Sequence, residues 1–568
     1  MSGNPFSSFA TAAPAAAAGS RAPQDGRSYV RGDASVPLRY TTLPALLADT
    51  VRRHGPRPAA VFREQGLRLS WYDLAARVDE LAAALLSVGI VRGDRVGIWS
   101  PNRVEWLLTM LATARIGAIL VNINPAYRSA ELAHALTLVQ VKALVMAPRF
   151  KGSDYLQILG PVRPAHLGLV VVLGPVPEAL PEGCLGFDAL RAMAGPAHRA
   201  RLDELSRALE PDDAINIQFT SGTTGAPKGA TLTHHNIVNN ALAVAQAMRL
   251  TAADRLCIPV PLYHCFGMVL GVLACMATGA AMVFPGEAFD AEATLAAVHH
   301  ERCTALHGVP TMFIAELDHP RFAEFDLSSL RTGIMAGAPC PVETMKRVVA
   351  QMHLREITIA YGMTETSPVS FQSGTDDPLE QRVSTVGRVL PHLEVKIVDD
   401  EGRIVPVGRR GELCTRGYSV MKGYWGDPAR TAEAVRGGWM HTGDLATLDE
   451  QGWCRIVGRV KDMLIRGGEN VFPREVEEFL HRHPKVQEAQ VFGVPDARLG
   501  EEVACWIVLK PGQQAGADEI RAFCQGQIAH HKVPRHIRFV AELPMTVTGK
   551  PQKFRMREAM MLELGLRP

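Results

Sequence analysis

The chain has little of what would indicate a disulfide scaffold or a zinc domain. Its 568 residues include 10 cysteines, and no two of them form a Cys-x-x-Cys pair. Scattered single cysteines supply neither the paired ligands of a zinc ribbon nor the dense pairing of small secreted domains. We therefore expect no zinc ribbon and no disulfide framework, and we expect the protein to lie in the reducing cytoplasm.

The sequence also lacks an excess of charge of either sign. Lys and Arg number 60 and Asp and Glu number 58, which gives a formal net charge of +2. Binding to nucleic acid or to an anionic membrane surface depends on a strongly basic field. This balance argues against nucleic acid as a partner, and any anion site must be local.

Long hydrophobic runs are scarce. One segment, 265–285, has no charged side chain and is about long enough to cross a bilayer. Gly267, Gly271 and Gly279 interrupt it, which favours a buried helix followed by a short strand at 280–284. No second segment of this kind follows, and we expect no integral membrane span.

The first 30 residues lack the apolar stretch of a secretory signal and are rich in Ala, Ser, Gly and Pro. We predict a disordered N-terminal extension over 1–30. The region is poor in acidic residues and contains Arg21 and Arg27, so an organellar transit peptide remains an alternative.

The rest of the chain divides into two parts by its pattern of apolar residues. Buried-strand patterns such as 95–99 and 169–173 alternate with helical patterns such as 71–88 and 102–116, which predicts α/β layers. After about residue 385, short strands with turn signals, as at 393–399, predict an antiparallel β subdomain.

A smaller α+β part is predicted beyond this subdomain. It contains a helix at 473–481, strands at 489–494 and 503–509, and a helix at 518–529. The fold class is therefore α/β, with a large N-terminal domain of layered α/β subdomains and a β subdomain over 31–459. A small α+β C-terminal domain follows over 460–568.

A loop rich in glycine and hydroxyl groups follows a strand predicted at 214–219. It reads Thr220-Ser221-Gly222-Thr223-Thr224-Gly225-Ala226-Pro227-Lys228-Gly229. Glycines let the backbone approach an anion, hydroxyl and amide groups donate to phosphate oxygens, and the lysine adds a positive charge. In a Walker A loop Ser or Thr follows the lysine, so a P-loop kinase or GTPase is disfavoured. A plain surface loop is a weaker interpretation, because such loops rarely combine these groups behind a buried strand.

The loop resembles the phosphate-binding signature of the adenylate-forming superfamily, which includes acyl-CoA synthetases, luciferases and the adenylation domains of peptide synthetases. Four more of its signatures resemble segments found in the same order: Tyr361-Gly362-Met363-Thr364-Glu365-Thr366, Trp439-Met440-His441-Thr442-Gly443-Asp444, Gly458-Arg459-Val460-Lys461-Asp462 and Thr548-Gly549-Lys550. The similarity extends over about 40–557. Each short motif is weak by itself, and the specificity comes from the whole set.

The resemblance implies ATP, Mg²⁺ and coenzyme A as the small molecules bound, and it implies roles for individual residues. The phosphates would be held by Thr220, Ser221, Gly222, Thr223, Thr224, Gly225 and Lys228. Tyr361 would line the adenine site, Thr364 would contact phosphate, Glu365 would hold Mg²⁺, and Asp444 and Arg459 would bind ribose. Gly337 and Ala338 are also expected among the cofactor-binding residues. Lys461 would be the hinge of a mobile C-terminal domain, and Lys550 would meet the substrate carboxylate and the α-phosphate.

The chemistry of acid activation requires these residue types. A carboxylate is a weak nucleophile and negative charge shields the α-phosphate, so its attack needs a cation and a lysine. Transfer to the thiol of coenzyme A then needs a narrow channel with small residues on its wall. Gly467 and Gly468 suit that wall, and the resemblance implies that they form the pantetheine tunnel after the C-terminal domain rotates. A plain glycine turn is the alternative.

The segment Pro261-Leu262-Tyr263-His264-Cys265-Phe266-Gly267 resembles the acyl-site motif of fatty and aryl acid ligases. His264 and Phe266 are expected to line the acyl site with Val309 and Gly337, although His264 could instead be a core histidine. The motif contains no acidic residue that could pair with the ammonium group of an amino acid. The expected substrate is an apolar acid. The pattern most resembles medium-chain acyl-CoA synthetases, and aryl, short branched or thio-substituted acids are the alternatives.

The expected protein is thus a cytoplasmic, ATP-dependent acyl-CoA ligase of fatty acid metabolism. A luciferase-like oxygenase, a peptide-synthetase module and a nucleotide-binding pseudo-enzyme are weaker hypotheses. The module would need a carrier domain after Lys550, and the pseudo-enzyme would be expected to have lost Lys550, Glu365 or the glycine-rich loop. A homodimer is left open.

Overall fold

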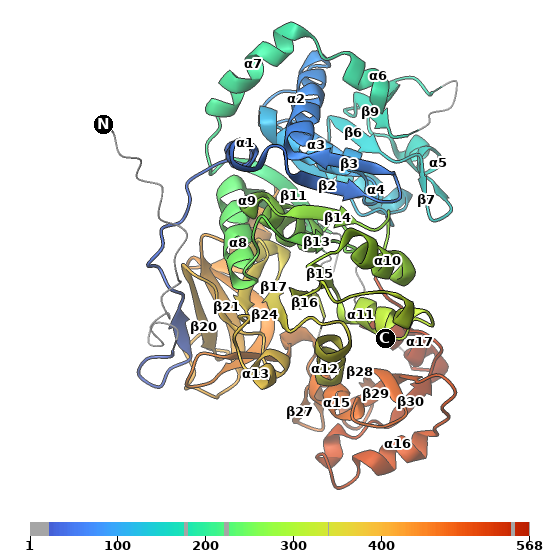
Figure 1. Ribbon diagram of the computed structural model, residues 1–568. Helices are drawn as coiled ribbons and strands as arrows, with labels where there is room; N and C mark the ends of the chain where they lie inside the picture. The colour runs from blue at the N-terminus through green and yellow to red at the C-terminus, as the bar shows by residue number, and fades with distance from the viewer. Residues whose placement is uncertain (1–21, 175–179, 221–226, 339, 547–550, 567–568) are drawn as a thin grey trace.

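The computed structural model describes residues 22–174, 180–220, 227–338, 340–546 and 551–566 (Figure 1). Two large sheets, a smaller β subdomain and a separate C-terminal α+β part make up this structure. The α/β fold class predicted from the sequence is therefore confirmed. Among the described residues, no helix is both long enough and apolar enough to cross a bilayer.

The first large sheet has eight strands in the order β10-β9-β6-β4-β5-β11-β12-β22. Its strands are β4 (Arg95–Trp99), β5 (Ile119–Asn122), β6 (Ala143–Met146), β9 (Leu169–Val172), β10 (Cys184–Gly186), β11 (Ala214–Thr220), β12 (Lys228–Thr233) and β22 (Gly423–Tyr424). The strands from β10 to β11 are parallel, whereas β12 runs antiparallel to both β11 and β22.

The second large sheet has nine strands in the order β19-β18-β17-β16-β15-β13-β14-β2-β3. Its strands are β2 (Pro58–Phe62), β3 (Leu67–Ser70), β13 (Arg255–Cys257), β14 (Ala281–Phe284), β15 (Ala305–Gly308), β16 (Thr332–Ala336), β17 (Glu356–Gly362), β18 (Val369–Gln372) and β19 (Arg388–Val389). The central strands are parallel and the edge strands β3, β18 and β19 are antiparallel. The carboxyl ends of the central strands therefore share one edge of the sheet.

One apolar core joins both sheets through a group of helices. The group contains α1 (Leu43–His54), α2 (Trp71–Ser87), α3 (Val104–Ile116), α8 (His234–Ala247), the π-helix η2 (Phe266–Leu273) and α9 (Ala274–Thr278). α7 (Pro196–Arg207) and α6 (Phe187–Ala192) pack on α2. α10 (Ala291–Glu301), α11 (Pro310–Leu317) and α12 (Val342–Gln351) share a second core with the nine-stranded sheet, and α4 (Ser129–Leu138) and α5 (Tyr155–Leu159) share a third with the eight-stranded sheet.

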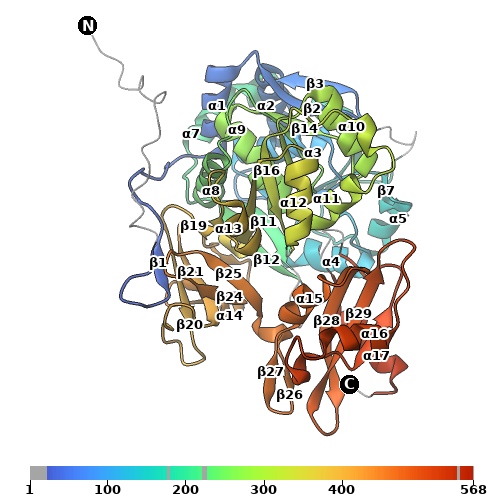
Figure 2. The ribbon, with the colours of Figure 1, turned by 60° about the horizontal axis from the view of Figure 1, so that its bottom comes forward.

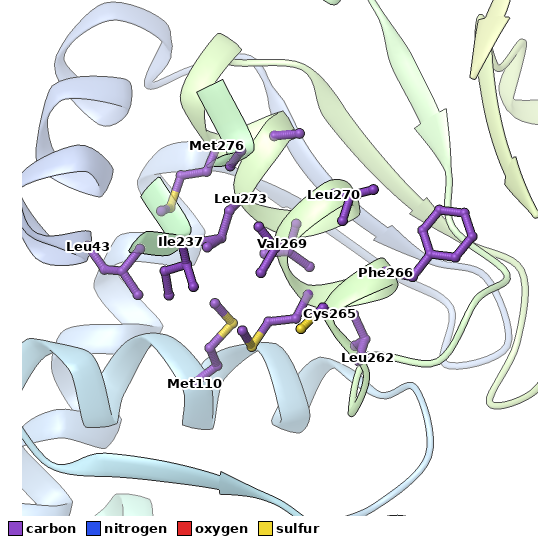
Figure 3. Close-up of a cluster of buried hydrophobic side chains, with 14 of the residues drawn as sticks. Leu43, Met110, Ile237, Leu262, Cys265, Phe266, Val269, Leu270, Leu273 and Met276 are labelled. Carbon is purple, nitrogen blue, oxygen red and sulfur yellow. The ribbon is translucent and has the colours of Figure 1, made fainter. Parts of the chain in front are cut away.

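The long apolar segment follows the predicted order of helix and strand, but its helix begins as a π-helix. η2 is buried along its whole length and continues into α9, and Gly279, with φ of +80°, ends the helix before β14. Figure 3 shows Val269 and Leu273 directed toward Met110 of α3 and Ile237 of α8, while Phe266 points away from this cluster. A Cβ at Gly267 would lie 2.4 Å from the carbonyl oxygen of Pro261, so the chain needs glycine there.

The predicted β subdomain is an antiparallel sheet in the order β1-β20-β21-β24-β23, with β25 paired to β24. Its strands are β1 (Tyr29–Arg31), β20 (Leu393–Val398), β21 (Gly411–Gly417), β23 (Val435–Arg436), β24 (Trp439–Leu448) and β25 (Cys454–Arg459). β1 begins inside the segment predicted to be a disordered extension, and Val30 is buried. The extension is therefore shorter than predicted, because Tyr29–Arg31 pairs with β20. Residues 1–21 of that segment lie outside the described residues.

The C-terminal part contains a five-stranded sheet and its own apolar cores. It consists of β26 (Leu464–Arg466), β27 (Glu469–Val471), α15 (Pro473–Leu480), β28 (Val486–Asp496), β29 (Gly500–Leu509), α16 (Ala517–Cys524), β30 (His536–Phe539) and α17 (Lys553–Glu563). The helix predicted over 518–529 ends at Cys524, and the chain turns at Gly526, where φ is +72°. In Figure 2 the β26–β27 hairpin lies on the side of this part that faces away from the two large sheets.

Short elements connect the larger ones. They are β7 (Arg149–Phe150), β8 (Ser153–Asp154), α13 (Leu379–Ser384), α14 (Pro428–Ala434) and the 3₁₀ turns η1 (Gly160–Val162), η3 (Phe322–Glu324), η4 (Thr364–Thr366), η5 (Val460–Asp462) and η6 (His530–Lys532).

Candidate active site

The two ends of the glycine-rich loop lie next to each other. β11 and β12 are antiparallel neighbours, and Thr220 at the end of β11 is the register partner of Lys228 at the start of β12. Ser221, Gly222, Thr223, Thr224 and Gly225 fall outside the described residues. The structure therefore places the two flanking members of the predicted phosphate site side by side.

A buried carboxylate joins this loop to the second sheet. Glu365 lies on η4, just after β17, and is 5% exposed. Thr220 Oγ1 donates to Glu365 Oε1 at 3.1 Å, and the hydroxyl of Tyr424 donates to the same oxygen at 2.9 Å. Lys228 Nζ in turn donates to that hydroxyl at 3.0 Å. Four elements, β11, β12, η4 and β22, thus carry one connected polar cluster, whose member Tyr424 was not predicted.

A second cluster forms where β17 meets the β subdomain. The hydroxyl of Tyr361 donates to Asp444 Oδ2 at 2.5 Å, and Arg459 Nε donates to Oδ1 at 3.0 Å. Asp444 on β24 and Arg459 on β25 are register partners, so strand pairing aligns them. Burial and the nearby Asp444 carboxylate raise the pKa of Tyr361 well above its usual value. The same carboxylate raises the pKa of Arg459, which keeps the guanidinium charged.

The part of β24 just before Asp444 is held by Glu412, which was also not predicted. His441 Nδ1 lies 2.8 Å from Glu412 Oε2, and the Gly443 N–H donates to Oε1 at 3.2 Å. Potential ligand atoms of Glu412, Cys414 and His441 lie within 4.8 Å of one another, as in a cation site. Both oxygens of the Glu412 carboxylate already take part in hydrogen bonds, so the group is better explained as support for this part of β24.

The predicted acyl-site residues lie on two parts of the chain, the start of η2 and the ends of two neighbouring strands of the nine-stranded sheet. His264 Nδ1 accepts the Phe266 N–H at 3.2 Å, at the start of η2. Val309 follows β15 and Gly337 follows the neighbouring strand β16. A Cβ on Gly337, where φ is +89°, would lie 3.2 Å from Val309 Cγ1, so these two positions are adjacent.

His307 is a buried histidine of this region. Its ring lies 5.3 Å from that of Phe266, and its Nε2 lies 3.0 Å from the carbonyl oxygen of Leu270 in η2. Burial lowers the pKa of His307 to about 4, so the ring is neutral near pH 7.

Among the other predicted residues, Thr364 is buried next to Glu365, and Ala338 follows Gly337 and is partly exposed.

Two predicted residues of the C-terminal part lie apart from these clusters. Gly467 and Gly468 form the turn between β26 and β27, with φ of +60° and +88°. A Cβ on Gly468 would have no described atom within 4 Å. Lys461 lies on η5 between β25 and β26, and Lys550 falls outside the described residues.

A glycine-rich loop and a buried carboxylate on the layered α/β sheets, with an aspartate–arginine pair on the β subdomain, define the class of an adenylate-forming enzyme. Comparison with known families agrees. Residues 47–425 match the AMP-binding enzyme family and residues 475–550 match the AMP-binding enzyme C-terminal domain. The chain therefore belongs to the AMP-binding enzyme family, in which it is an AMP-forming acyl-CoA synthetase.

Curated relatives support this assignment over nearly the whole length. A putative acyl-CoA synthetase, YngI of Bacillus subtilis (strain 168), is 47% identical over 535 residues, which cover 92% of this chain and 97% of the relative. The mitochondrial medium-chain acyl-CoA ligase ACSF2 of Danio rerio is 45% identical over 555 residues, covering 95% and 91%.

Among solved structures, the anthranilate CoA ligase AuaEII in complex with anthranoyl-AMP has a TM-score of 0.84 at 28% identity. The alignment covers 94% of this chain and 99% of that one. A fatty acyl CoA synthetase of Mycobacterium tuberculosis has a TM-score of 0.70 at 27% identity, covering 92% and 99%.

Proposed function

We propose that the acid activated by this enzyme is an unbranched fatty acid of medium length. The observation that carries this proposal is the apolar character of η2 and of the adjacent pair Val309 and Gly337, which would line the acyl site. His307, the polar side chain that contacts both Phe266 and η2, is neutral and supplies no countercharge. The name of the relative ACSF2 points to the same chain length.

We propose that ATP binds across the two polar clusters. Asp444 and Arg459 would hold the ribose, Tyr361 would line the adenine site with Gly337 and Ala338, and the loop from Thr220 to Lys228 would hold the phosphates. Thr364, which precedes Glu365 on η4, would contact the same phosphates. In this arrangement the nucleotide extends from the β subdomain to the glycine-rich loop.

The residues present fit a magnesium ion at Glu365. Carboxylate oxygens are preferred ligands of this cation, and the described hydrogen bonds to the Glu365 side chain both fall on Oε1. When bound, Mg²⁺ would neutralise phosphate charge. Glu365 would then orient the triphosphate, while Lys550 would neutralise charge at the α-phosphate as the carboxylate attacks and diphosphate leaves.

We further propose that the C-terminal domain, residues 460–568, rotates about Lys461 relative to residues 31–459 between the two half-reactions. The β26–β27 turn faces away from the large sheets (Figure 2). A rotation would bring Gly467 and Gly468 to the acyl-AMP, where the thiol of coenzyme A attacks the acyl carbon and AMP leaves.

The substrate proposal is tested by diphosphate release with acetate, butyrate, hexanoate, octanoate, decanoate, palmitate and benzoate, each with and without coenzyme A. Each buried methylene contributes about 0.8 kcal/mol, so kcat/KM should rise about fourfold per methylene until the pocket ends. A maximum at acetate or benzoate would contradict the proposal. The benzoate arm also tests an aryl acid as the substrate, which the fold similarity to an anthranilate CoA ligase favours.

We propose a role in fatty acid metabolism in the cytoplasm. Fractionation of cells that express the tagged full-length chain would test this location, because an organellar address is the alternative. A homodimer would be detected by sedimentation of the purified protein.

A further inference from the structure

Tyr424 connects the phosphate loop to the predicted magnesium ligand. It lies on the two-residue strand β22, opposite Ala230 of β12, and is 6% exposed. Its hydroxyl receives a hydrogen bond from Lys228 and donates one to Glu365. The ammonium of Lys228 also lies 4.2 Å from the centre of the Tyr424 ring. Both the ring and the hydroxyl of this one side chain therefore contact the loop lysine.

The direction of these hydrogen bonds is fixed by chemistry. A lysine ammonium can only donate, an ionised carboxylate can only accept, and a phenol has a single proton. The hydroxyl must accept from Lys228 and give its proton to Glu365.

The hydroxyl also selects which oxygen of Glu365 is available. Oε1 accepts from both Tyr424 and Thr220. A carboxylate oxygen with two donors has little capacity left for a cation, so Oε2 is the oxygen presented to a metal ion. Without the Tyr424 hydroxyl, only Thr220 of these two donors would still hold the Glu365 carboxylate, which could then rotate.

The backbone around Tyr424 is tied to both partners. The Met421 N–H donates to the carbonyl of Glu365 at 2.9 Å, and the Trp425 N–H donates to the carbonyl of Gly229 at 2.8 Å. The segment from Met421 to Trp425 therefore spans the gap between the loop end and η4. A rigid spacer of this kind positions charges without touching the reacting atoms.

We propose that Tyr424 is a positioning residue that sets the distance between the loop lysine and the metal-binding oxygen of Glu365. This inference rests on the proposed ATP site and adds a residue to it. Its consequence is specific: loss of the hydroxyl should weaken nucleotide binding mainly when Mg²⁺ is present, because the misplaced group is the metal ligand.

The test is Tyr424→Phe, which keeps the ring and removes the hydroxyl. Binding of ATP to the full-length protein would be measured by calorimetry with MgCl₂ and with EDTA. Loss of a hydrogen bond to a charged group lowers affinity by about tenfold or more. The Kd of Tyr424→Phe for ATP with MgCl₂ should therefore rise about tenfold. Binding of adenosine, which has no phosphate, should be unchanged.

Tyr155→Phe is the matched control. Tyr155 is fully buried and its hydroxyl donates to the carbonyl of Pro125 at 2.6 Å, in the core of the eight-stranded sheet. This variant should leave ATP binding unchanged, and it reports the general cost of removing a buried phenol hydroxyl. Thermal unfolding of both variants shows whether the fold is retained.

Two results would overturn the inference. One is an unchanged Kd of Tyr424→Phe for ATP with MgCl₂, and the other is an equal loss with MgCl₂ and with EDTA. If the unsubstituted protein itself fails to bind ATP in either condition, the proposed nucleotide site is wrong, which is a different failure. If Tyr424→Phe does not fold, Thr220→Val tests the same statement, because it removes the other donor to Oε1 and should shift Kd in the same Mg²⁺-dependent way.

Discussion

The stability of this protein should fall with rising pH because of one carboxylic acid in its interior. Glu316 lies on α11, the helix that begins directly after Val309, and its side chain is fully buried near the apolar side chains of Phe313 and Leu317. Neither carboxylate oxygen has a hydrogen-bond partner among the described residues. Burial therefore raises the pKa of Glu316 well above its usual value.

The sign of the effect follows from proton counting. In the unfolded chain a glutamate has a pKa of about 4.3, so above that pH it has lost its proton, while Glu316 in the folded protein keeps its own. The folded state then binds more protons than the unfolded state, and the free energy of unfolding decreases as pH rises. The contribution is fully present below about pH 4.3 and is lost progressively until the pH passes the raised pKa.

The magnitude is about 1.4 kcal/mol per pH unit within that window. Glu316→Gln has nearly the same shape and cannot ionise, so its stability relative to the unsubstituted protein should increase with pH at this slope. Urea unfolding at pH 5, 6, 7 and 8 would measure the difference between midpoints. Glu433→Gln, on the exposed surface of α14, reports the effect of the same change in charge at the surface. A difference between Glu316→Gln and the unsubstituted protein that does not vary with pH would refute this reasoning.

Two further predictions concern the proposed reaction. Asp444→Ala and Arg459→Ala should each raise KM for ATP about tenfold or more and change KM for the acid less, which steady-state kinetics would measure; a selective rise in KM for coenzyme A would contradict the ribose assignment. Lys550→Ala should slow acyl-AMP formation about 10²- to 10³-fold and spare thioester formation from supplied acyl-AMP, whereas Gly468→Leu should do the reverse. Equal slowing of both half-reactions by each variant, in folded protein, would contradict the proposed domain rotation.

Elements with a local signal were predicted well from the sequence. The helix predicted over 71–88 is α2, Trp71–Ser87, because Ser70 and Asp73 form a capping box that can be recognised from residue spacing. The helix predicted over 518–529 ends five residues early, because its end depends on the backbone conformation near Gly526 rather than on hydrophobic periodicity. The π-helix η2 was also missed, since an apolar run on all sides has no periodicity that separates a π-helix from an α-helix.

Candidate site residues were found when they belonged to a contiguous motif. Thr220, Lys228 and Glu365 were predicted, and the structure brings them into one cluster. Tyr424 was missed because it is 196 residues from Lys228 and 59 from Glu365. A two-residue strand carries no pattern of its own, and only its pairing with β12 reveals the contact. Glu412 escaped prediction for the same reason, since its role depends on the pairing of β21 with β24.

Gly468 illustrates how the structure limits what a motif means. The φ of Gly468 is +88°, in the left-handed region that favours glycine. A plain turn between β26 and β27 is enough to explain this conformation. The absence of any described atom within 4 Å of a Cβ there shows that packing in this arrangement does not exclude a side chain. Backbone conformation therefore accounts for a glycine without any tunnel. Rates of the two half-reactions of Gly468→Leu therefore decide whether this glycine lines a tunnel. A strained turn would slow both half-reactions, whereas an obstructed channel would slow only the transfer to coenzyme A.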